Sequence, residues 1–168
     1  IPQGVKIELN QSTLSVTGPK GVLTSEVNPE VKITIGEQEV QVEKIGKSKK
    51  APAIWGTETR LIENMFEGVT KGFQKQLELS GVGYRMAVAG KKINLALGFS
   101  HPVEVEIFEG IEVKIENAIM TISGIDKQKV GQFSADIKAL KPVEPYKGKG
   151  FHYVGEFVRR KEGKKAGA

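Results

Sequence analysis

A short run near the C-terminus, PYKGKG, combines residue types that suit binding to a polyanion. Lys147 and Lys149 are separated by one residue, so in an extended segment their ammonium groups would lie on one side, about 7 Å apart by strand rise. That separation is comparable with the phosphate spacing along a nucleic-acid strand. Gly148 and Gly150 would let phosphates approach closely, and Tyr146 offers a face on which a base or ribose can stack. The run therefore predicts contact with a nucleic-acid backbone.

The charge of the chain is concentrated around this run. Residues 141–168 contain eight Lys or Arg and three Glu, whereas residues 1–140 contain 17 residues of each sign, so the whole net charge of +5 lies in the last sixth of the sequence. A solvated tail that binds nothing would not need the interleaved glycines, prolines and aromatic residues, so we favour nucleic acid as the partner. Phe151 and Tyr153 would add stacking faces where they are exposed. Further contacts are predicted from other polar residues of the tail: His152, Arg159, Arg160, Lys161, Lys164 and Lys165.

Two other groups of cations are weaker candidates. A basic connection contains Lys44, Lys47, Lys49 and Lys50, and it is either a contact with RNA or protein or a solvated linker. The predicted hairpin near residue 90 adds Arg85, Lys91 and Lys92 as RNA contacts.

Signatures of enzymes are absent from the sequence. It has no Cys and two His, which argues against a thiolate nucleophile, a disulfide framework or a zinc site. Gly46-Lys47-Ser48 resembles the end of a P-loop, but the position of the first glycine is Gln41. Alternating glutamates such as Glu104 and Glu106 are typical of the solvent face of a sheet. We expect no enzyme, no cofactor and no metal, and no apolar run reaches the length of a membrane-spanning helix.

The elements that must position these residues follow from the hydrophobic periodicity. Alternation predicts a hairpin over residues 5–17, a strand over 23–27 and a hairpin over 31–42. A helical stripe from Ile62 to Leu77 predicts a helix that Thr57 or Thr59 caps and that ends before Gly81. The order hairpin, strand, hairpin, helix then recurs about 80 residues later, with a second helix from Asp126 to Pro142.

This repeat predicts an α+β fold of two tandem similar domains, each an antiparallel β-sheet packed on one α-helix, with a basic C-terminal tail. The expected division is an N-terminal α+β domain over residues 1–80, a C-terminal α+β domain over 81–142 and a basic RNA-binding extension over 143–168. We expect the tail to be ordered around Tyr153 to Arg159, and residues 161–168 to order only on RNA.

Five segments in order resemble the family of ribosomal protein six of the bacterial large subunit, and the likeness runs along the whole chain. The segments are Gly18-Pro19-Lys20-Gly21, Gly81-Val82-Gly83-Tyr84-Arg85, Gly98-Phe99-Ser100-His101-Pro102-Val103, residues 124–131 (GIDKQKVG) and residues 144–150 (EPYKGKG).

The resemblance implies a structural constituent of the large ribosomal subunit, in the cytoplasm, that binds 23S-type ribosomal RNA near the stalk base and the sarcin–ricin loop and so supports translation. Implied partners are this RNA, neighbouring ribosomal proteins of the stalk base and translation-factor GTPases, with no membrane. The RNA-contact role of the family's tail motif falls on Tyr146, Lys147, Gly148 and Lys149. Because the sequence begins at Ile1 without a Met, we expect a short basic leader to be missing from it.

Two other classes of function compete with this interpretation. A protein-interaction module would dock the basic tail on an acidic protein and would show no preference for structured RNA. A hydrolase with paired carboxylates would need an apolar cleft around perturbed acids, and the alternating glutamates give no sign of one.

Overall fold

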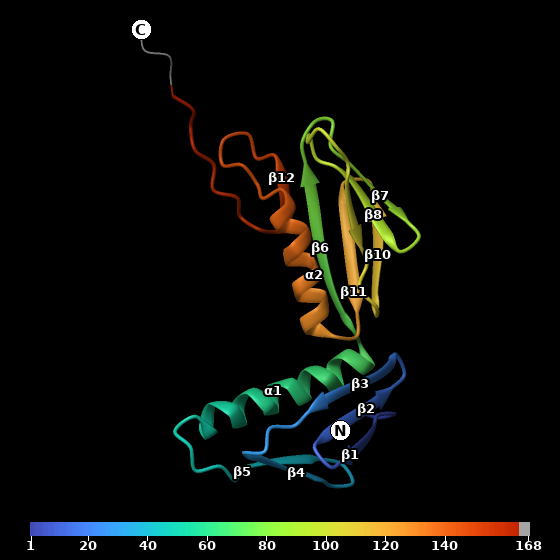
Figure 1. Ribbon diagram of the computed structural model, residues 1–168, viewed down its shortest axis with the longest axis vertical. Helices are drawn as coiled ribbons and strands as arrows, with labels where there is room; N and C mark the ends of the chain where they lie inside the picture. The colour runs from blue at the N-terminus through green and yellow to red at the C-terminus, as the bar shows by residue number, and fades with distance from the viewer. Residues whose placement is uncertain (165–168) are drawn as a thin grey trace. The chain divides into compact units, whose positions relative to one another are not determined.

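A computed structural model describes residues 1–164, which form two compact units. The first unit contains residues 1–73 and 125–127, and the second contains residues 74–124 and those from Gln128 onward. Each unit has antiparallel sheets and one helix (Figure 1). The predicted α+β class is therefore confirmed.

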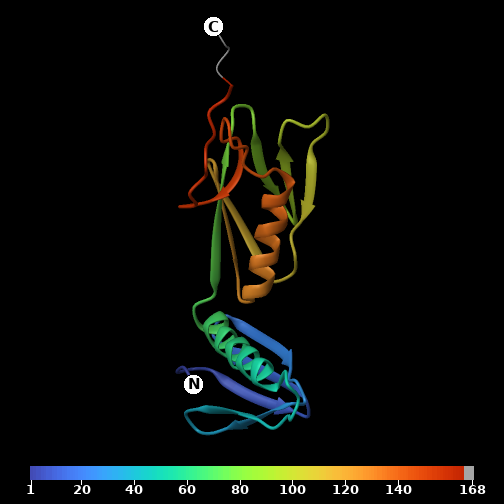
Figure 2. The same cartoon turned by 90° about the vertical axis from the view of Figure 1, so that its left-hand side faces the viewer.

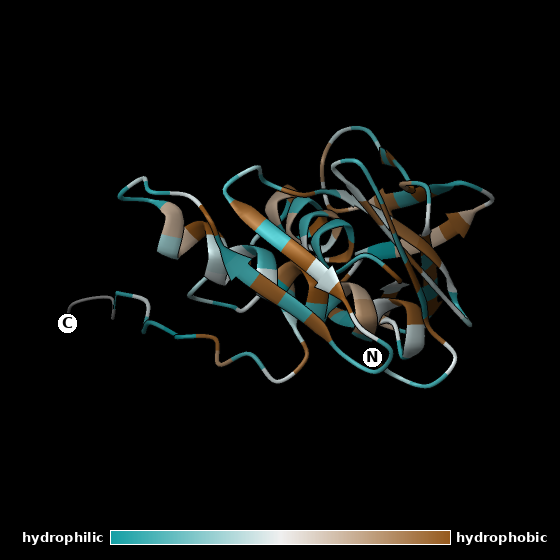
Figure 3. Cartoon of the chain, turned by 90° about the horizontal axis from the view of Figure 1, so that it is seen from below, coloured by the Kyte–Doolittle hydropathy of each residue, from teal (hydrophilic) through white to brown (hydrophobic). Residues whose placement is uncertain are grey.

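The first unit is a three-stranded sheet, a hairpin and a helix. Strands β1 to β3 pair in that order, and β4 pairs with β5. The elements are β1 (Lys6–Asn10), β2 (Thr13–Gly18), β3 (Gly21–Glu26), β4 (Val31–Ile35), β5 (Val40–Lys44) and α1 (Ala51–Thr70). Brown and teal alternate along the strands in Figure 3, as period-two patterning requires. The apolar face of β2 buries Leu14 and Val16 against Ile62, Met65 and Val69 of α1.

Helix α1 begins and ends earlier than the sequence predicted. Pro52 lies in its first turn, where a fixed φ and a missing N–H suit a helix start. Thr57 and Thr59 do not cap the helix, because their hydroxyls donate to carbonyls one turn back, 3.0 and 2.8 Å away. The helix ends at Thr70 because Gly72 adopts a positive φ of 78° and its N–H donates to the Glu67 carbonyl, 3.0 Å away.

The second unit repeats the order hairpin, strand, hairpin, helix, as predicted. Strands β7 to β9 pair in that order, and a four-stranded sheet has the order β10-β11-β6-β12. The elements are β6 (Phe73–Ser80), β7 (Arg85–Ala89), β8 (Lys92–Ala96), β9 (Val103–Glu106), β10 (Ile111–Glu116), β11 (Ile119–Gly124), α2 (Lys127–Leu140) and β12 (Gly150–Tyr153). Helix α2 lies along the four-stranded sheet (Figures 1 and 2) and buries Val130, Phe133 and Ile137.

Strands β6 and β12 were not predicted from the sequence. Residues Phe73 and Leu77, assigned to the first helix, belong to β6, whose inner face buries Leu77 and Leu79. Strand β12 pairs antiparallel with β6, from Gly150 opposite Ser80 to Tyr153 opposite Leu77. Part of the basic tail is therefore an edge strand of the second sheet.

Gly18, at the end of β2, lies close against Val69 of helix α1. A Cβ on Gly18 would lie 2.7 Å from Val69 Cγ2 and 2.8 Å from the Val69 carbonyl oxygen. Val69 is fully buried and the oxygen belongs to the backbone, so neither atom can move aside cheaply. We expect Gly18→Ala to lower the free energy of unfolding by about 1–3 kcal/mol, measured by urea denaturation.

The matched control is Gly56→Ala in α1. A Cβ there would meet nothing within 4 Å, so the helix propensity of Ala should raise stability by about 0.5–1 kcal/mol. Equal effects of the two substitutions would contradict the packing described for Gly18.

Candidate nucleic-acid interface

The PYKGKG run forms a closed loop rather than the extended segment that we expected. The Glu144 N–H donates to the Lys149 carbonyl, 2.9 Å away, and the Gly148 N–H donates to the Glu144 carbonyl, 3.0 Å away. Gly148 adopts a positive φ of 70°, which reverses the chain where only glycine does so without strain. The expected 7 Å alignment of Lys147 and Lys149 along a strand is therefore wrong, and we name residues 144–149 the basic loop.

Gly150, the next residue, anchors the basic loop to the sheet. It is buried, and a Cβ there would lie 2.6 Å from the Pro142 carbonyl oxygen and 2.7 Å from that of Lys141. Phe151 then donates its N–H to the Lys141 carbonyl, 2.8 Å away, and its side chain is fully buried. Phe151 is thus a core residue and cannot be the stacking face considered from the sequence.

The chain after β12 returns to the basic loop. The Lys161 N–H donates to the Pro145 carbonyl, 2.8 Å away. A Cβ on Gly148 would lie 3.3 Å from Arg160 Nη2 and 3.6 Å from its Nε, so the guanidinium lies against the glycine. The fold therefore brings Arg160 and Lys161 to the loop that contains Tyr146, a residue that is 54% exposed. Lys147, Arg159, Arg160, Lys161 and Lys164 are exposed and Lys149 is partly buried, while Lys165 lies outside the described residues.

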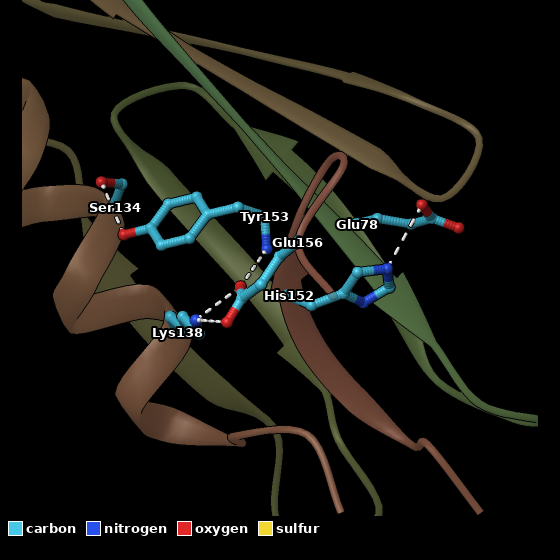
Figure 4. A network of polar contacts seen from close by, with 6 residues as sticks. All are labelled: Glu78, Ser134, Lys138, His152, Tyr153 and Glu156. Carbon is cyan, nitrogen blue, oxygen red and sulfur yellow. Dashed lines mark hydrogen bonds and ion pairs between the residues drawn. The ribbon is translucent and has the colours of Figure 1, made fainter. Parts of the chain in front are cut away.

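A polar network fixes the place where the chain turns back (Figure 4). Both Glu156 carboxylate oxygens accept from Lys138 Nζ of α2, at 2.7 and 2.6 Å. One of them also accepts from the Tyr153 N–H at 2.9 Å, and the Glu156 N–H donates to the Tyr153 carbonyl at 2.9 Å. The Lys138 hydrogen bond and then the Tyr153 N–H hold the pKa of Glu156 below its ordinary value.

The Tyr153 ring is part of the same network. Lys138 Nζ lies 4.6 Å from its centroid and Lys75 Nζ lies 5.0 Å from it, both within cation–π range. The hydroxyl is 3.4 Å from Ser134 Oγ. Lys75 and Lys138 are not predicted from the sequence, because the helical stripe places Lys75 in a helix and no local pattern pairs Lys138 with Glu156.

His152 faces the neighbouring strand. Its Nε2 lies 3.5 Å from Glu78 Oε2, its cross-strand partner, and its side chain is 17% exposed. Nδ1 is buried without a hydrogen-bond partner among the described residues. The contact of His152 with RNA stays a prediction, and the structure places the ring beside a carboxylate.

The other predicted cations lie in separate places. Arg85 begins β7, whereas Lys91 lies in the turn after the far end of that strand and Lys92 begins β8. Lys92 Nζ is 3.3 Å from Glu104 Oε2, in an exposed ion pair. The third group belongs to the first unit and is exposed: Lys44, Lys47, Lys49 and Lys50.

The described residues contain no cluster of three or more His, Asp or Glu side chains that could hold a metal ion. Among the same residues, neither helix combines the length and apolar character needed to cross a bilayer.

Comparison with known proteins places this arrangement in a class of ribosomal proteins. The family model of ribosomal protein L6 matches residues 1–72 and 80–154. The chain is 48% identical to large ribosomal subunit protein uL6 of Carboxydothermus hydrogenoformans, over 99% of this chain and 92% of the relative. Identity is also 48% with the uL6 protein of Oleidesulfovibrio alaskensis, over 99% and 93%, and 46% with that of Shouchella clausii, over 98% and 93%.

The chain therefore belongs to the ribosomal protein L6 family. This confirms the resemblance found in the sequence, and makes the chain a structural, non-enzymatic ribosomal protein that acts in translation on the cytoplasmic ribosome.

The Lys138–Glu156 pair predicts a pH dependence. The lowered pKa of Glu156 means that its contribution to stability is complete above the ordinary value of 4.5 and is lost as pH falls through the lower value of the folded chain. The contribution is small because the carboxylate is 37% exposed and solvent screens it. In a ¹³C carboxyl NMR titration, we expect Lys138→Met to raise the Glu156 midpoint toward the ordinary value.

The control Lys114→Met removes the same charge from an exposed position of β10. It should leave the Glu156 midpoint unchanged. A midpoint that does not move in Lys138→Met would refute the assigned hydrogen bond.

Proposed function

We propose that this chain is a constituent of the large ribosomal subunit that binds 23S-type ribosomal RNA through its second unit, near the stalk base and the sarcin–ricin loop. The observation that carries the proposal is the clustering of Arg160 and Lys161 on the basic loop with Lys147 and Lys149. The relatives are named as proteins of the large ribosomal subunit, and this supports large-subunit RNA as the ligand of this chain.

In the proposed mechanism, the cations neutralise phosphates and the ring of Tyr146 stacks on the RNA. Arg160 presents a planar fork that suits phosphate oxygens, and the lysines act as point charges. Tyr146 is exposed enough to stack on a base or ribose. Because the major groove of an RNA helix is deep and narrow, recognition rests on shape, backbone and 2′-hydroxyls rather than on major-groove base edges.

The ion pair between Lys138 and Glu156 affects the charge of this surface. Lys138 of α2 neutralises Glu156, the carboxylate at the turn, so this anion does not oppose the phosphates. Among the described residues, the ion pairs do not engage Lys147, Lys149 or Arg160. These cations are therefore available to a ligand.

The remaining predicted contacts complete the proposal. In the second unit we assign RNA contact to Gly148, Gly150, His152, Arg159, Lys164, Lys165, Arg85, Lys91 and Lys92, with Lys44, Lys47, Lys49 and Lys50 of the first unit as an RNA or protein contact. Neighbouring ribosomal proteins of the stalk base and translation-factor GTPases are the proposed protein partners. Cross-linking in assembled large subunits, with peptide and nucleotide both mapped, tests this placement, and cross-links that avoid the second unit would refute it.

Salt dependence tests the basic loop directly. Each neutralised phosphate adds about 0.7–0.9 to the slope of log K against log salt. We expect Lys147→Ala with Lys149→Ala to reduce that slope by up to about two in filter binding to an rRNA fragment that carries the sarcin–ricin loop.

The matched control is Lys6→Ala with Lys32→Ala, two exposed lysines of the first unit whose loss changes the net charge equally. It should leave the slope unchanged. Equal slopes in the two double variants would remove the basic loop from the interface. Preferential binding of the unaltered chain to polyglutamate would instead favour an acidic protein as the partner.

A further inference from the structure

The loop between β6 and β7 presents an apolar side chain to solvent. Residues 81–84 connect the two strands, and Val82 at the tip is 93% exposed. No other exposed large hydrophobic residue of the described chain is more accessible. A single exposed apolar residue is ordinary on a protein surface, so its meaning depends on how the loop is built and what surrounds it.

The loop is built around the ring of Tyr84. A Cβ on Gly81 would lie 2.6 Å from Tyr84 Cδ2, and a Cβ on Gly98 would lie 3.1 Å from its Cε1. The ring therefore packs closely on two glycines, one on each side of the β7–β8 hairpin in the sequence. Gly81 and Gly83 have positive φ values of 145° and 84°, which glycine tolerates best. The glycines and the ring fix a loop whose tip, Val82, contributes nothing to the core.

The loop leaves the sheet beside the basic loop. Ser80 at the end of β6 is the ladder partner of Gly150 at the start of β12. Neighbouring strands lie about 4.8 Å apart. Gly81, which follows β6, therefore lies next to Lys149, which precedes β12. Figure 2 shows the two loops at the same end of the second unit. Arg85 follows two residues after Gly83 and begins β7, so each end of the loop that carries Val82 adjoins a cationic residue.

We propose that Val82 is a further RNA-binding residue, which packs against the ribose faces of the wide, shallow minor groove of the RNA held by the basic loop. This inference rests on the proposed function. An anionic partner is favoured because a cationic residue adjoins each end of the loop, Lys149 beside Gly81 and Arg85 directly after Tyr84. The minor groove of an RNA helix is the surface that a short side chain can reach, since the major groove is deep and narrow.

An apolar contact differs from a phosphate contact in its response to salt. It releases no counterions, so its loss lowers affinity without changing the salt slope. Removing two methyl groups from Val82 should weaken binding by about three- to tenfold if the side chain is largely buried in the complex. The side chain lies outside the core, so the unfolding temperature of the free protein should not change.

The test uses the full chain and the rRNA fragment that carries the sarcin–ricin loop. We expect Val82→Ala to weaken binding by about three- to tenfold at every salt concentration with an unchanged slope, and Val82→Ile to retain affinity. The control Val22→Ala removes the same atoms from a side chain of the first unit that is 53% exposed, and should have no effect.

The outcomes separate this inference from the proposed function. Unchanged affinity in Val82→Ala, with a reduced slope in the Lys147→Ala and Lys149→Ala variant, overturns the role of Val82 and leaves RNA binding in place. A reduced slope in Val82→Ala also overturns it, because the effect would then come from displaced cations. Absence of binding by the unaltered chain overturns both.

Discussion

The pairing of β12 with β6 is the constraint on which the candidate interface depends. Four residues, Gly150–Tyr153, join the sheet as an edge strand, and the fully buried Phe151 ties that strand to the core. Burying such a side chain stabilises by about 1.5–3 kcal/mol, enough to hold a short edge strand. The pairing fixes both ends of the candidate interface, because the basic loop directly precedes β12 and the segment that contains Arg160 follows it.

An ion pair between Lys138 and Glu156 also holds the turn that follows β12. The chain that leaves β12 carries the Glu156 carboxylate at its turn, and both of its oxygens accept hydrogen bonds from Lys138 Nζ of α2. An exposed ion pair of this kind contributes little to stability. Its value lies in geometry, since it joins the turn to a helix and neutralises an anion next to the surface that we propose to bind phosphates. Among the described residues, Lys147, Lys149 and Arg160 take part in none of the ion pairs.

Local periodicity predicted most of the fold, and the exceptions have physical reasons. Alternation identified β1 to β5 and β7 to β11, because each of these strands has one face on the core and one in water. Strand β6 was missed because Phe73 and Leu77 are four residues apart and continue the helical stripe of α1. Gly72, where the positive φ ends that helix, was the overlooked signal. Strand β12 was missed because four residues are too few to establish alternation.

The same limits apply to the candidate site. Composition identified the residues of the basic loop but not its shape, because prolines favour an extended chain and only the hydrogen bonds of Glu144 reveal the closure. Lys138 and Glu156 are 18 residues apart, so no local pattern could pair them. The two units share one order of elements, yet only the second gains β6 and β12 and the surplus of charge. A shared architecture therefore carries different surfaces, with the net positive charge on the second unit and equal numbers of cations and anions on the first.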